Sequence, residues 1–71
     1  MHRVVSCDVA REWLLDSVMN HHTTESLAQC IISLCPKKMT YRQFINEAVG
    51  HEWPQCIKDA TICLRRVGIR V

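Results

Sequence analysis

The stretch Thr-Tyr-Arg-Gln-Phe-Ile-Asn-Glu-Ala-Val-Gly at residues 40–50 indicates the fold class most clearly. Its apolar side chains recur at intervals of three and four, the spacing that places them on one face of an α-helix. Thr40 and Gln43 have the pattern of a capping box, in which each side chain satisfies the other's backbone amide. Gly50 readily adopts the left-handed conformation that closes many helices. The stretch predicts an amphipathic helix at 40–49, with Tyr41, Phe44, Ile45, Ala48 and Val49 on its apolar stripe.

Two helices are predicted before this stretch. Apolar residues at helical spacing predict a first helix near residues 8–20, capped by Ser6 or Asp8. Apolar residues surround almost all of a second segment at 24–35, so we expect that helix to be the buried central element. Pro36 ends it, because a proline disfavours helical backbone at the residue before it. The stripe of the first helix consists of Val9, Trp13, Leu14, Val18 and Met19.

A fourth helix is predicted after the quoted stretch. It covers residues 54–67, because Pro54 suits the first helical position and Gly68 suits the position after the last. Residues 3–5 and 69–71 are rich in β-branched side chains and look extended, so these short segments are able to pair as strands. The apolar stripe of the fourth helix consists of Ile57, Ala60, Leu64 and Val67.

The composition favours one domain. A chain of 71 residues has room for a single core, and 48% hydrophobic with 23% charged residues is typical of globular proteins rather than disordered ones. Two glycines and two prolines leave little sequence for long loops. We therefore expect residues 1–71 to form a compact all-α domain of four helices.

The sequence also favours a cytoplasmic location. The first residues lack the uninterrupted apolar region of a secretion signal, and no apolar run is long enough to span a membrane. Five cysteines are an odd number, and Cys30, Cys56 and Cys63 lie on or beside the predicted stripes. We therefore expect reduced thiols that pack as small apolar groups, and no membrane partner.

Charge is divided unevenly along the chain. Residues 1–35 contain two basic and four acidic side chains, a balance of −2, whereas residues 36–71 contain seven basic and three acidic ones, a balance of +4. Two groups of basic residues lie at the start of the third helix and on the outward side of the fourth. Such clusters are typical of surfaces that contact phosphates. The predicted nucleic-acid-binding residues are Lys37, Lys38, Arg42, Lys58, Arg65 and Arg66.

The helical pair at 40–67, joined through Gly50 to Trp53, resembles a loose helix-turn-helix. The resemblance implies that the second helix of the pair enters the major groove of DNA. We therefore interpret the protein as a small nucleic-acid-binding regulator. No Asn or Gln lies in the exposed middle of the fourth helix to read a base.

The alternative interpretation is a protein–protein interaction module, such as a small inhibitor or adaptor. Such a module would self-associate through the apolar surface of the second helix, which Ile32 represents. Trp53, directly before Pro54, either staples the turn or projects outward as an interface anchor. Trp13 and Tyr41 lie on predicted stripes, so we expect both in the core.

Metal and catalytic sites are not predicted. The Cys30–Cys35 pair points about 140° apart on a helix, and the Cys56–Cys63 pair is separated by about 10 Å along the axis, so neither chelates one zinc ion. The histidines at 21–22 are the remaining candidate ligands. No catalytic motif or phosphate-binding loop is present. We expect no enzyme activity, no cofactor and no small-molecule substrate.

Overall fold

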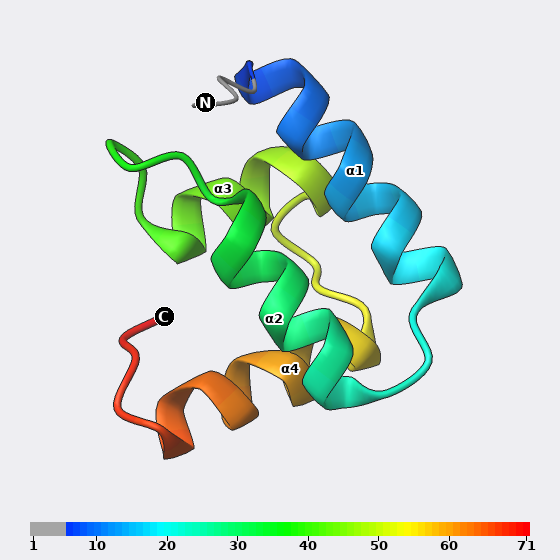
Figure 1. The fold of residues 1–71 in the computed structure, drawn as a ribbon, viewed down its shortest axis with the longest axis vertical. Helices are drawn as coiled ribbons and strands as arrows, with labels where there is room; N and C mark the ends of the chain where they lie inside the picture. The colour runs from blue at the N-terminus through cyan, green and yellow to red at the C-terminus, as the bar shows by residue number, and fades with distance from the viewer. Residues whose placement is uncertain (1–5) are drawn as a thin grey trace, which may run out of the picture.

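The computed structural model describes residues 6–71, which form four helices and no strand (Figure 1). The predicted all-α class and its four helices are confirmed, and each predicted helix boundary differs from the structure by at most one residue. Residues 3–5 lie outside the described residues, and 69–71 follow the last helix without regular secondary structure. The helices are α1 (Cys7–Asn20), α2 (Thr24–Leu34), α3 (Tyr41–Val49) and α4 (Gln55–Arg66).

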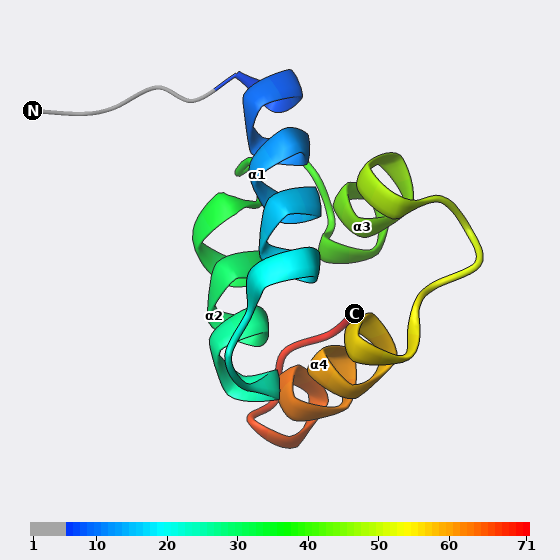
Figure 2. The same cartoon turned by 90° about the vertical axis from the view of Figure 1, so that its right-hand side faces the viewer.

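The second helix is central, as its composition predicts. It contacts each of the other three helices, and it contacts α4 most extensively. In both ribbon views α1 runs alongside α2, while α3 and α4 lie toward opposite ends of this pair (Figures 1 and 2). The core therefore forms around α2.

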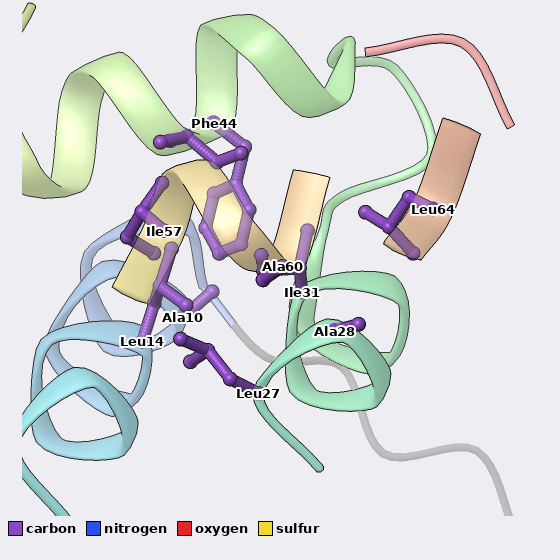
Figure 3. Close-up of a cluster of buried hydrophobic side chains, with 10 residues drawn as sticks. Ala10, Leu14, Leu27, Ala28, Ile31, Phe44, Ile57, Ala60 and Leu64 are labelled. Carbon is purple, nitrogen blue, oxygen red and sulfur yellow. The ribbon is translucent and has the colours of Figure 1, made fainter. Parts of the chain in front are cut away.

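In the described part of the chain, ten buried apolar side chains form the core, and Figure 3 shows them converging from all four helices. The ring of Phe44 on α3 points between Ile57 of α4 and Ile31 of α2. Each fully buried side chain of this size stabilises the fold by about 1.5–3 kcal/mol. The ten residues are Ala10, Leu14, Leu27, Ala28, Ile31, Phe44, Ile45, Ile57, Ala60 and Leu64.

The buried face of α1 differs from the predicted stripe. Trp13 and Met19 are 41% and 85% exposed, so their predicted place in the core is wrong. The side that packs inward instead carries Ala10, Leu14 and Val18, which recur every four residues. The reason is steric: the small side chain of Ala10 lets α1 approach its neighbours closely, whereas a tryptophan on this face would hold it away.

Gly68 closes α4. The Gly68 amide donates to the Arg65 carbonyl and the Ile69 amide donates to the Leu64 carbonyl, each at 3.0 Å. These two bonds, with a φ of 90° at Gly68, form a Schellman motif. Val67 was predicted on the buried stripe, but it lies past the last helical residue and is 72% exposed.

The segment 50–54 leaves α3 in an extended direction. Gly50 was predicted to close α3 in the left-handed conformation. Its φ of 86° is positive, as predicted, but its ψ of −177° is extended and not the left-handed helical value. Its amide donates to the Asn46 carbonyl at 2.9 Å, which ends the helix. The chain then runs to Pro54, whose carbonyl accepts the first amide bonds of α4. This segment separates α3 from α4 (Figure 2).

The start of α3 has half of the predicted capping box. The Thr40 hydroxyl accepts a bond from the Gln43 amide at 3.0 Å, as predicted. The Gln43 side chain does not return this bond, because its amide nitrogen donates to Glu47 Oε2 at 3.0 Å instead. The i to i+4 bond along the helix surface thus replaces the reciprocal half of the box.

Replacing Thr40 by Ala should lower the free energy of unfolding by about 1 kcal/mol, because the Gln43 amide loses its partner at the helix start. Gln43→Ala should change it by less than about 0.5 kcal/mol, because the side chain makes only an exposed surface bond. Denaturant unfolding of both variants measures the difference. Equal losses would mean that the reciprocal box forms in solution.

Candidate functional site

Arg42, in the first turn of α3, lies against the half-buried ring of Trp53. Its guanidinium carbon is 5.3 Å from the centre of the ring, within the range of a cation–π contact. The indole nitrogen of Trp53 donates to Asn46 Oδ1 at 2.7 Å, one turn further along α3. Of the two alternatives for Trp53, this geometry matches the staple, because the side chain holds segment 50–54 against α3.

Segment 67–71 connects Arg42 to α4. The Val71 carbonyl oxygen accepts bonds from Arg42 Nη2 and from Arg65 Nη2, each at 3.4 Å. Arg42 and Lys58 also line one small hollow, together with Trp53. Three exposed cations from two helices therefore lie around one region, which we call the basic face: Arg42, Lys58 and Arg65.

Among residues 6–71, no Asp or Glu side chain forms an ion pair with the basic face. The ion pairs in this part of the chain both involve Arg11, which contacts Asp8 and, at 3.4 Å, Glu47. Both pairs join α1 to itself or to α3, away from Lys58 and Arg65 on α4. Arg42 and Arg65 instead donate to the Val71 oxygen, and no acidic side chain of this part of the chain neutralises the charge of the basic face.

The other predicted site residues lie elsewhere. Arg66 points about 100° around the axis of α4 from Arg65, so it lies outside the basic face. Lys38 is exposed in the turn before α3, and Lys37 in the same turn lines a separate, larger hollow. Ile32 is half-buried, packs against the core and lines the larger hollow, and its place in a self-association surface stays a prediction. Arg70 also lines the larger hollow, but it follows Gly68 outside any periodic pattern, so no sequence signal predicts it as a site residue.

The pair formed by α3 and α4 is looser than a helix-turn-helix. α3 packs mainly against α1, and α4 packs mainly against α2. The views agree that segment 50–54 spans a wide separation between them (Figures 1 and 2). The basic face is therefore built across two helices and two connecting segments, rather than along one helix.

Cys35 lies at the end of α2 and lines the larger hollow. Its sulfur is 3.5 Å from the Pro36 carbonyl oxygen and 3.4 Å from the Met39 carbonyl oxygen, with the thiol as donor. Burial raises the pKa of the Cys35 thiol. The group is therefore a neutral donor near pH 7, and not an activated nucleophile.

The described residues contain no group of three side chains placed to hold a metal ion, and none of their helices is long and apolar enough to cross a membrane. The five cysteines carry free thiols. Comparison with models of protein families, with curated protein sequences and with solved structures finds no match to this chain.

At pH 8, iodoacetamide should alkylate Cys35 at least about five times more slowly than the exposed Cys7, because a raised pKa and partial burial both reduce the accessible thiolate. As pH rises further, the Cys35 rate should increase because more thiolate forms. Mass mapping of labelled peptides over time measures both rates. Equal rates at pH 8 would contradict this burial of Cys35.

Proposed function

We propose that this protein binds nucleic acid by contacting phosphates through the basic face. One observation carries the proposal: guanidinium groups from α3 and α4 donate to the same oxygen atom, that of Val71. Two arginines that converge on one acceptor have the arrangement that a phosphate group favours. Lys58 adds a third cation beside Arg42.

The arrangement favours contacts to the backbone of nucleic acid over reading of bases. On α4, Ile62 lies between the two cations on the outward side and is 43% exposed, so the middle of this surface is apolar. Gln55, the one amide side chain on α4, donates to Asp59 at 2.9 Å and is occupied. Phosphate contacts position a protein on a duplex without selecting a sequence. We therefore propose sequence-tolerant binding.

The distribution of charge supports one orientation of the protein on an anionic partner. Glu12 and Asp16 are exposed on α1, in the half of the chain whose balance is −2. The basic face belongs to the half whose balance is +4. A charge asymmetry of this kind steers the basic side toward nucleic acid and turns the acidic side away.

A second candidate function is the protein-interaction module, and an observation on α1 favours it. Leu15 and Met19, one helical turn apart, are 44% and 85% exposed. Exposed apolar side chains that share a helix face are typical of interaction sites. The partner, a second copy or another protein, would contact this face of α1.

The double substitution Lys58→Gln/Arg65→Gln should weaken binding to duplex DNA. It should also flatten the slope of log affinity against log salt by about 1.8, because each lost phosphate contact removes about 0.9. Arg66→Gln is the control, since Arg66 is also exposed on the same helix but points about 100° away from Arg65. Fluorescence anisotropy titrations at several salt concentrations measure both slopes, and circular dichroism verifies the fold.

The control slope should equal that of the wild type. If the wild-type protein does not bind duplex DNA at low salt, the proposal is wrong and the interaction module becomes the better candidate. If Arg66→Gln lowers the slope per charge as much as the double variant does, the attraction is diffuse and the basic face is not the site.

A further inference from the structure

The larger hollow named above lies where α2 ends and α3 begins. It has a volume of about 810 Å³, within the range typical of small-molecule sites. Its apolar lining comes from Ile32, Met39, Tyr41 and Val71, and each of these side chains packs against the core behind it. The hollow therefore has a fixed apolar floor that stays accessible from outside.

Basic side chains surround this floor. Lys37 comes from the turn before α3, Arg42 from α3 itself and Arg70 from segment 67–71, and all three are exposed. No acidic side chain is among the residues that line the hollow. Cations gathered from three segments without an acidic side chain among them repel one another, and a bound anion relieves that repulsion.

We propose that this hollow binds a free small molecule that joins one anionic group, such as a carboxylate, sulfonate or phosphate, to an apolar body. The anionic group would lie among Lys37, Arg42 and Arg70, and the apolar body would cover Ile32 and Met39. Both parts of the occupant follow from the lining: a simple ion would leave the apolar floor uncovered, and a neutral apolar molecule would leave the cations unpaired.

This site is separate from the proposed nucleic-acid contact, although Arg42 belongs to both. Lys37 and Arg70 line the hollow but are not part of the basic face, whereas Lys58 and Arg65 do not line the hollow. Variants at Lys37 and Arg70 therefore test the small-molecule site and leave the basic face intact. Failure of one proposal does not imply failure of the other.

Anilinonaphthalene sulfonate is a suitable probe, because it carries one sulfonate on apolar rings and fluoresces when its rings leave water. We expect one molecule to bind per chain. Phenylnaphthylamine has the same rings without the sulfonate, so it should bind roughly tenfold more weakly. Fluorescence titration of the wild-type chain with each compound measures the two affinities.

The double variant Lys37→Glu/Arg70→Glu should weaken sulfonate binding roughly tenfold. The matched control is Lys38→Glu/Arg66→Glu, which makes the same change in charge at exposed neighbouring positions that do not line the hollow. The control should stay within about twofold of the wild type. Both variants should still bind duplex DNA if the basic face is the nucleic-acid site, because Arg42, Lys58 and Arg65 are unchanged.

A second measurement needs no variant. Because Cys35 lines the hollow, the bound sulfonate should slow its alkylation, while the alkylation of exposed Cys7 should not change. The proposal is overturned if the neutral compound binds as tightly as the sulfonate. It is equally overturned if both double variants weaken binding alike, if the probe binds only to aggregated chains in sedimentation, or if Cys35 is not protected.

Discussion

Leu27, Ala28 and Ile31 of α2 are buried where the other three helices meet, and the rest of the structure depends on covering them. A 71-residue chain buries a smaller share of its surface than a larger domain does, so each helix must contribute to the same core. α1 packs along α2, and α4 crosses toward its other end. α4 packs mainly against α2, and α3 packs mainly against α1. As a result, α3 and α4 are held in place by other helices more than by each other.

That separation explains how the candidate site forms. The gap between α3 and α4 is bridged by the connecting segments, through Trp53 bonded to Asn46 and through the Val71 oxygen. Arg42 contacts both bridges, so its guanidinium is placed by an aromatic ring on one side and an acceptor on the other. A side chain restrained in this way loses less conformational entropy on binding than a free surface arginine.

The helices could be predicted from sequence because their ends are encoded locally. The Thr40 hydroxyl caps the amide three residues later, and Gly68 forms a Schellman motif with α4. The face of α1 could not be predicted in the same way, because Ala10 contributes little to an apolar pattern that Trp13 dominates. Close packing favours the opposite choice, because the small Ala10 side chain fits at the contact between helices and the large Trp13 side chain does not.

The members of the candidate site were predicted only in part, for a related reason. The charge pattern identified Arg42, Lys58 and Arg65 together with Lys37, Lys38 and Arg66, because it shows only which basic side chains face away from the apolar stripes. Which of these side chains lie near one another depends on the path of segments 50–54 and 67–71. That path is set by tertiary contacts, such as the indole bond of Trp53, for which no periodic signal exists.

The claim that nucleic acid meets the basic face is tested most directly by two-dimensional amide NMR during a titration with duplex DNA. The two tryptophans give separate indole signals, one from the side that carries the basic face and one from α1. We expect the indole signal of Trp53 and the amide signals of Arg42, Lys58 and Arg65 to shift together, while those of Leu15 and Met19 stay in place. Shifts confined to α1, with the basic face unchanged, would contradict the account.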